Sequence, residues 1–190
     1  MKPFLIFVFS FVLLVSCAKE KQVQSNDVQA PAQTETQHKG QANVAAGEGE
    51  DLNALQVAKS LDDFSTLVAA IETAGVQDAV VNAGPLTIVA PLNSAFAKLP
   101  EGTVENLLQP ENRPTLAYIL TNHVAPANYP IKQLKKEAKK GRKLYMASGQ
   151  YLEVKVEGED VYVGGTKILQ SVKVSNGWIH VIDDVIVPAE

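Results

Sequence analysis

The stretch NGWIHVIDDVIVP, residues 176–188, decides the fold class of this 190-residue chain. It opens with Asn-Gly, the dipeptide most typical of a tight β-hairpin turn. β-branched and aromatic residues follow the dipeptide, and a similar run, residues 168–174, precedes it. Because strands favour such residues, the sequence predicts two antiparallel strands joined at Asn176 and Gly177.

The rest of the C-terminal third has the same character. Residues 151–157 alternate between apolar and polar side chains, as a half-buried strand does. Glycines separate this run from residues 161–163 and from the hairpin. We therefore expect an antiparallel β-structure in this third of the chain.

Residues 62–75 have a helical period instead. Apolar side chains recur at helical spacing from Phe64 to Ile71. Asp62 or Asp63 is a candidate N-cap, and Gly75 lies where a helix C-terminus favours a left-handed residue.

The residues that follow predict one strand and several short helices. Residues 86–90 are typical of a short buried strand, and Asn93 is a candidate cap for the helical turn after it. Further helices are expected at 103–108 and 112–121. Because helices precede most strands and no βαβ unit repeats, the predicted class is α+β.

Three blocks in this part of the chain resemble the fasciclin domain family. They are TIVAPLNSAF at 87–96, LAYILTNHV at 116–124 and the stretch at 176–188. The first block of the family usually ends Ala-Pro-Thr-Asn-x-Ala-Phe, and its last usually reads Asn-Gly-x-Ile-His-x-Ile-Asp-x-Val-Leu-x-Pro. The family-motif positions to which we assign a structural role are Pro91, Asn93, Phe96, Asn176, Gly177, His180 and Asp183.

The resemblance implies a wedge-shaped antiparallel β-sandwich flanked by several short helices, over residues 51–190. It also implies a role in adhesion to surface or matrix components, and no shared catalytic activity. The middle block commonly contains Tyr-His, which is linked to receptor binding in animal relatives. Asn122 stands in place of that tyrosine, and Asn122, His123 and Val124 form one candidate binding site.

The N-terminus has the pattern of an export signal. Lys2 and the apolar run Phe4–Val15 are typical of a signal peptide, residues 1–16, which is too short to span a membrane. The quartet Leu-Val-Ser-Cys that ends at Cys17 resembles the lipobox of bacterial lipoproteins, which predicts a lipid on this cysteine and thus a membrane anchor. The alternative is an ordinary secretory signal in which the chain's single cysteine is incidental.

Residues 17–50 are expected to be a disordered linker. They contain no aromatic residue, Leu or Ile, so they cannot bury enough apolar surface to fold. The linker is either a tether for the domain or a passive spacer. Ala18 is not the aspartate that lipoproteins associate with inner-membrane retention, so the outer membrane or cell surface is the expected location.

A concentration of cations is the strongest departure from ordinary composition. Seven cations and one acid, Glu137, lie between Lys132 and Lys143, a net charge of +6 that leaves −10 for the rest of a chain whose total is −4. Apolar residues at helical spacing predict a short helix with the cations on its outer face. The basic segment, as we call it, comprises Lys132, Lys135, Lys136, Lys139, Lys140, Arg142 and Lys143.

Two interpretations of the basic segment remain open. It is either a solvated face that keeps the protein soluble, or a docking patch for anionic glycans or lipid headgroups. Attraction to such a patch would weaken with salt.

The remaining polar residues favour binding over catalysis. His123 and His180 have no carboxylate or thiolate at ligand spacing, so they make a poor metal site. We expect His180 to bond the backbone and His123 to face the carbonyls at a helix end. Asp183 and Asp184, as strand neighbours, would point to opposite faces and could not pair as acid and base. We predict no enzyme activity, metal, cofactor or nucleic-acid partner.

The leading functional hypothesis is an adhesion module on a lipid tether, facing the cell surface or periplasm. Its partner would be an anionic glycan, a matrix or envelope polymer, or a surface protein. The alternative is a carrier of a small apolar ligand in a cleft between helices and sheet, and a third possibility is a structural role without a discrete ligand. Trp178 could serve as a core anchor or as an exposed contact.

Overall fold

The computed structural model describes residues 52–82 and 84–188. The predicted signal peptide at 1–16, the lipidation site Cys17 and the linker at 17–50 lie outside the described residues. Within the described ranges, no helix is both long enough and apolar enough to cross a membrane.

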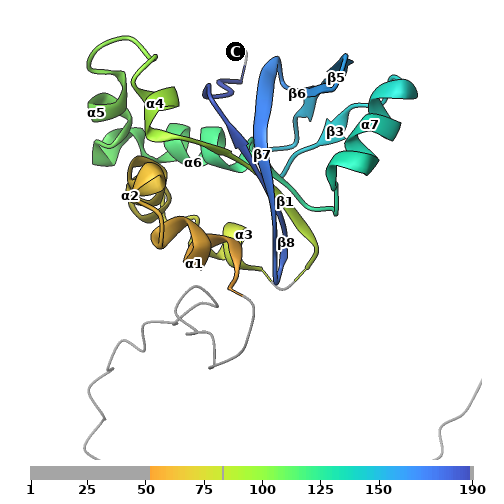
Figure 1. The fold of residues 1–190 in the computed structure, drawn as a ribbon. Helices are drawn as coiled ribbons and strands as arrows, with labels where there is room; N and C mark the ends of the chain where they lie inside the picture. The colour runs from red at the N-terminus through yellow and green to blue at the C-terminus, as the bar shows by residue number, and fades with distance from the viewer. Residues whose placement is uncertain (1–51, 83, 189–190) are drawn as a thin grey trace, which may run out of the picture. The chain divides into compact units, whose positions relative to one another are not determined.

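Most helices precede most strands, as Figure 1 shows. The helices are α1 (Ala54–Lys59), η2 (Asp62–Phe64), α2 (Ser65–Ala74), α3 (Gln77–Val81), α4 (Asn93–Phe96), α5 (Thr103–Leu107), η3 (Pro110–Asn112), α6 (Arg113–Thr121) and α7 (Ile131–Lys139). The strands are β1 (Leu86–Pro91), β2 (Val124–Ala125), β3 (Leu144–Tyr145), β4 (Tyr151–Leu152), β5 (Val154–Glu157), β6 (Asp160–Val163), β7 (Thr166–Val174) and β8 (Gly177–Ile182). The predicted α+β class is confirmed.

A six-stranded sheet in the order β2-β1-β8-β7-β6-β5 runs through the described residues, and β3 pairs separately with β4. β7 and β8 form the hairpin predicted at Asn176 and Gly177. The antiparallel sandwich that the family resemblance implies has one exception, because β1 runs parallel to β8. Parallel neighbours need a crossover connection, and the long chain between β1 and β8 supplies it.

Two hydrophobic cores lie on opposite faces of the sheet. Alternate residues of a strand point to opposite faces, so Ile88 and Ile179 join the core beneath α1, α2, α3 and α6. Val89 and Ile182 join a second core, which α7 and strands β3 to β6 enclose. In Figure 1 the sheet curls between these two sets of elements. All six residues of β1 are buried, as the predicted buried strand requires.

The helix predicted from the Phe64–Ile71 period is α2. Its expected C-cap is confirmed, since Gly75 adopts a left-handed conformation with φ 70°. The expected N-caps are wrong: Asp62 and Asp63 lie inside the short helix η2, and neither side chain caps α2.

Gly177 occupies a position that no other residue fits. Its φ is 145°, and a Cβ there would lie 1.8 Å from the carbonyl oxygen of Leu86. Because Leu86 and Gly177 are register partners, this close approach sets the alignment of β1 with β8.

We therefore expect Gly177→Ala to lower the free energy of unfolding by more than about 3 kcal/mol, because backbone atoms must move apart. Urea unfolding would measure the loss. Gly149→Ala is the matched control, because Gly149 has a φ of 87° and the added Cβ has no atom of a distant residue within 4 Å. We expect this variant to lose only the cost of the left-handed backbone conformation, about 1–2 kcal/mol. Equal losses in the two variants would contradict the steric argument.

Candidate functional site

Asn93, the first residue of α4, bonds to η2 and to the start of α2, which are distant from it in sequence. Its Oδ1 accepts the backbone N–H of Thr66 at 3.0 Å, and its Nδ2 donates to the carbonyl oxygen of Asp62 and the hydroxyl of Ser65, each at 2.9 Å. Asn93 thus supplies the missing cap of α2. The expectation that it caps its own helix is wrong, because it is the first residue of α4 and the N-cap position there belongs to Leu92.

Asn176 performs a similar task at the other end of the helical layer. Its Oδ1 accepts the N–H of Ala54 at 3.0 Å, and its Nδ2 donates to the carbonyl oxygen of Val80 at 2.9 Å. The side chain is buried, so both bonds lie away from solvent. One side chain in the hairpin turn therefore holds both α1 and α3.

His180 and Thr87 hold residues 126–130 against the sheet. Nε2 of His180 donates to the carbonyl oxygen of Tyr129 at 2.7 Å, and the hydroxyl of Ser171 donates to its Nδ1 at 2.8 Å. The hydroxyl of Thr87 donates to the carbonyl oxygen of Ala127 and accepts the N–H of Tyr129. The predicted backbone bond of His180 is confirmed. Burial lowers the pKa of His180, against the opposing effect of the Tyr129 carbonyl.

His123 is a buried neutral link between three segments. Its Nδ1–H donates to the carbonyl oxygen of Ile119 at 2.8 Å, as expected at a helix end, and its Nε2 accepts the N–H of Ile186 at 3.0 Å. Its carbonyl oxygen accepts the N–H of Val89. Burial lowers the pKa of His123 from 6.5 to about 4, although the Ile119 carbonyl opposes the shift. The ring is therefore uncharged at neutral pH.

The candidate binding site at Asn122, His123 and Val124 is buried in the described structure, at 0%, 3% and 3% exposure. Oδ1 of Asn122 accepts the hydroxyl of Ser148 at 2.8 Å, while its Nδ2 has no hydrogen-bond partner among the described residues. In this conformation none of the three side chains presents a surface to a macromolecular partner.

The other motif residues also serve the fold. Pro91 is buried at the end of β1, and Phe96 packs against the helical core. β8 ends at Ile182, so the expectation that Asp183 and Asp184 are strand neighbours is wrong. Asp183 instead contacts the hydroxyl of Thr166 and the ammonium of Lys98, each at 3.4 Å, whereas Asp184 accepts the N–H that follows it.

The basic segment forms the outer face of α7 and the turn after it. The apolar stripe predicted there points inward: Leu134 is fully buried, and Ile131 and Ala138 pack against the second core. The single acid of the segment, Glu137, is buried too, where Gln133 donates to it and Arg142 pairs with it at 3.6 Å. Glu137 therefore pairs with one cation of the segment, Arg142, and within the described structure makes no ion pair with the segment's lysines.

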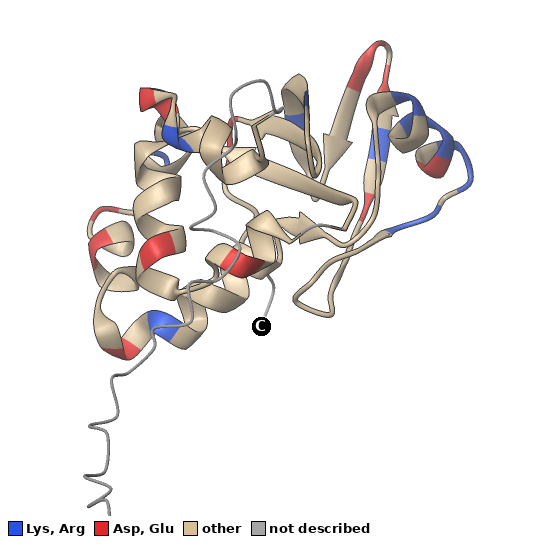
Figure 2. Ribbon diagram, turned by 90° about the horizontal axis from the view of Figure 1, so that it is seen from below, with Lys and Arg blue, Asp and Glu red and all other residues tan. Residues whose placement is uncertain are grey.

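Four lysines of this segment have no carboxylate within ion-pair distance among the described residues. They are Lys132, Lys136, Lys139 and Lys140, all exposed. The first three lie at i, i+4 and i+7 on α7, so they share one stripe of the helix. Lys135 and Lys143 instead contact Glu159 and Glu153 at 3.5 and 3.4 Å. Figure 2 shows Lys and Arg concentrated on α7 and the chain just after it.

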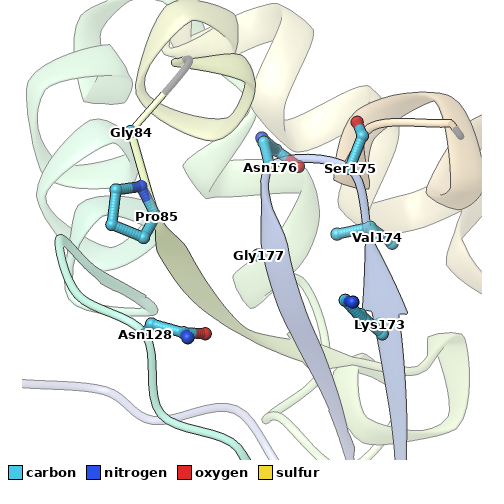
Figure 3. Close-up of a pocket in the computed structure, with 8 residues that line it drawn as sticks. All are labelled: Gly84, Pro85, Asn128, Lys173, Val174, Ser175, Asn176 and Gly177. Carbon is cyan, nitrogen blue, oxygen red and sulfur yellow. The ribbon is translucent and has the colours of Figure 1, made fainter.

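A second feature is an open hollow of about 350 Å³ beside the β7–β8 hairpin (Figure 3). Asn128 and Lys173 lie on opposite sides of it, and Ser175 lies at the turn. The side chains of these three residues have no hydrogen bond or ion pair with other described residues. The hollow is open and its lining mixes these polar side chains with Pro85 and Val174, whereas a site for an apolar ligand is usually enclosed and mostly apolar.

The space between helices and sheet is nearly filled. The apolar cavity there, lined by residues such as Phe64, Ile88 and Ile179, has a volume of about 20 Å³. Small-molecule sites usually measure about 300–1,000 Å³. No group of three or more His, Cys, Asp or Glu side chains that could hold a metal occurs within residues 52–82 and 84–188.

Comparison with known proteins gives the family. The family model described as the fasciclin domain matches residues 62–188. The chain belongs to the fasciclin family.

Two relatives and one solved structure are similar to this fasciclin domain over most of its length. Protein sll1483 of Synechocystis sp. is 41% identical over 160 residues, covering 84% of this chain and 86% of that protein. Protein sll1735 of the same organism is 37% identical over 138 residues, or 70% and 96% of the two chains. The FAS1 domain pair of the insect cell adhesion molecule fasciclin I matches with a TM-score of 0.49 and 22% identity, over 65% of this chain and 44% of that one.

The fasciclin motif thus marks residues that hold the domain together. The sequence identified Asn93, Asn176 and His180 but not their partners. Thr87, Ser148 and Ser171 look like ordinary strand or loop residues, and their roles depend on contacts between distant segments. Trp178 on β8 is half-buried, so it is neither a fully buried core anchor nor a fully exposed contact.

The buried His123 predicts acid sensitivity of the fasciclin domain. Its pKa is about 4 in the folded state and about 6.5 unfolded, so between these values the unfolded state binds more protons. Stability is then fully present above about pH 6.5 and falls as the pH falls, by about 1 kcal/mol per pH unit from this residue near pH 5. Urea unfolding across this window would measure the slope.

His123→Gln is the test variant, because Gln keeps polar groups but does not titrate. We expect a shallower dependence of the unfolding free energy on pH between about 5 and 6.5, whatever the stability lost at neutral pH. His180 remains in the variant, so some slope should persist. An unchanged slope would contradict the role assigned to His123.

Proposed function

We propose that this fasciclin domain is an adhesion-type binding module that docks an anionic polymer on the basic segment, and that it is not an enzyme. The observation that carries the proposal is the stripe of exposed lysines on α7 that have no carboxylate within ion-pair distance among the described residues. The adhesion role implied by the family resemblance agrees with such a surface.

The electrostatics favour a large anionic partner. Lys132, Lys136 and Lys139 share one side of α7, so their charges add over a short distance. A polymer can contact several of them at once, whereas a single small anion would meet one flexible side chain. The other polar binding candidates, Asn122 and His123, are buried within the fold.

The carrier alternative has less support. A cavity of about 20 Å³ between helices and sheet has space for about one water molecule, not for an apolar ligand. The hollow beside the hairpin is larger, but its free side chains are polar.

Binding of the purified chain to alginate, a polyuronate, tests the proposed docking surface. We expect binding at low ionic strength that weakens as salt is added, since the Debye length is about 8 Å at 0.15 M. Changing Lys136, Lys139 and Lys140 to Glu should weaken the affinity by about tenfold or more, because three of the four lysines without an ion-pair partner reverse their charge.

Changing Lys59, Lys98 and Lys173 to Glu gives a control with the same change in net charge at scattered positions. This control should lose much less affinity than the stripe variant. Equal losses would show that only net charge matters, and no binding of the unchanged chain at low salt would rule the function out.

We further propose that the domain is exported and anchored in a bacterial membrane, at the outer membrane or cell surface, through a lipid on Cys17 and the tether 17–50. The Leu-Val-Ser-Cys quartet that ends at Cys17, after the apolar run, supports this part of the proposal. A clickable fatty acid fed to a bacterial host should label the chain, and Cys17→Ser should abolish the label. Ser16→Ala, which keeps a small residue before the cysteine, should retain it. Labelling of the Cys17→Ser chain would exclude this anchor.

A further inference from the structure

Two tyrosines next to the basic segment lie exposed and packed against each other. Tyr145 and Tyr151 are 48% and 62% exposed, with ring centroids 5.4 Å apart and an angle of 57° between the ring planes. They are direct partners in the register of β3 and β4. Their only ring contact within the described residues is with each other, so both rings remain open to a partner.

The hairpin fixes these rings outward. The neighbouring residues Leu144 and Leu152 are 1% and 8% exposed in the second core. Since side chains alternate along a strand, the buried leucines force Tyr145 and Tyr151 to the opposite face. The core thus holds both rings in place, so a partner that binds them would cost little conformational entropy.

Lysine side chains lie on the same face of the hairpin as the two tyrosines. Lys143 lies two residues before Tyr145, and Glu153 two residues after Tyr151, so all four share one side of the hairpin. The ammonium groups of Lys143 and Lys155 contact the two oxygens of Glu153 at 3.4 and 3.7 Å. The tyrosine platform therefore merges with the end of the basic segment.

This combination suits sugars that carry charge. The C–H face of a pyranose ring is apolar and packs on an aromatic ring, while phenol hydroxyls can bond sugar hydroxyls. Uronate or sulfate groups on the same polymer would meet the lysines. The surface is an open face rather than a pocket, so a polymer can cross it without ending there.

We propose that Tyr145 and Tyr151 form a stacking platform for an anionic polysaccharide, whose charged groups bind Lys143 and the exposed lysines of the basic segment. The inference rests on the proposed function and specifies its partner. An anionic membrane fits less well, because a layer of lipid phosphates offers no sugar ring to the tyrosines and few hydroxyls to Glu153, which lies between the two lysines. A sugar hydroxyl can instead donate to that carboxylate.

The test compares two polyanions, of which only one has sugar rings. Affinities of the whole chain for alginate and for polyphosphate are measured at one low ionic strength. Changing both tyrosines to Ala should weaken alginate binding roughly tenfold and leave polyphosphate binding within about twofold. Changing both to Phe keeps the rings and should preserve alginate binding within about twofold. Both tyrosines are exposed, so urea unfolding should show only a small loss of stability in the Ala variant, from the cross-strand pair, and each variant should stay folded in the binding assay.

The outcomes separate this inference from the proposed function. Two results together support the docking surface and the platform. The variant at Lys136, Lys139 and Lys140 loses binding to both polymers, and the Ala variant loses binding to alginate alone. If the Ala variant binds alginate as well as the unchanged chain does, or weakens equally toward both polymers, the platform is overturned while the basic docking surface stands. Tyrosine-dependent binding to anionic phospholipid vesicles in place of alginate would also overturn it. If the unchanged chain binds neither polymer, both proposals fail.

Discussion

Six residues of β1 pair in parallel with six residues of β8, and every residue of β1 is buried. One face of this pair contributes Ile88 and Ile179 to the helical core, and the other contributes Val89 and Ile182 to the core beneath α7. A slip of one residue would exchange the two faces and disrupt both cores at once. The contact of Gly177 with the Leu86 carbonyl prevents such a slip, so the helical layer and the curled strands both depend on a glycine in a hairpin turn.

Much of this architecture could be predicted from the sequence, because it depends on local patterns. The period from Phe64 to Ile71 predicted α2, the Asn-Gly turn predicted the β7–β8 hairpin, and alternation predicted strands near β4 and β5. The direction of β1 relative to β8 could not be predicted, since no local pattern specifies the partner of a strand that is distant in sequence. The same limit applies to Asn93, which caps α2 rather than its own helix.

The sequence could predict a candidate site only where the spacing of apolar residues showed which side chains are exposed. The outward face of α7 could be predicted because Leu134 and Ala138 define the inward one. Asn122 and His123 were candidate binding residues through family resemblance, yet the structure buries both, with His123 bonded to Ile186 and Asn122 to Ser148. The alternation over residues 151–157 separates Tyr151 from Leu152, but the pairing of Tyr151 with Tyr145 across a turn exists only in three dimensions.

The β3–β4 hairpin consists of two register pairs and stands apart from the six-stranded sheet. It adds few backbone bonds to the domain and none to the β1–β8 pairing, and of its paired residues only Leu144 and Leu152 enter the second core. Its surface residues can therefore change during evolution without threatening the fold. The residues that hold the domain together and those of the proposed docking surface thus lie in separate parts of the chain, so the two can change independently.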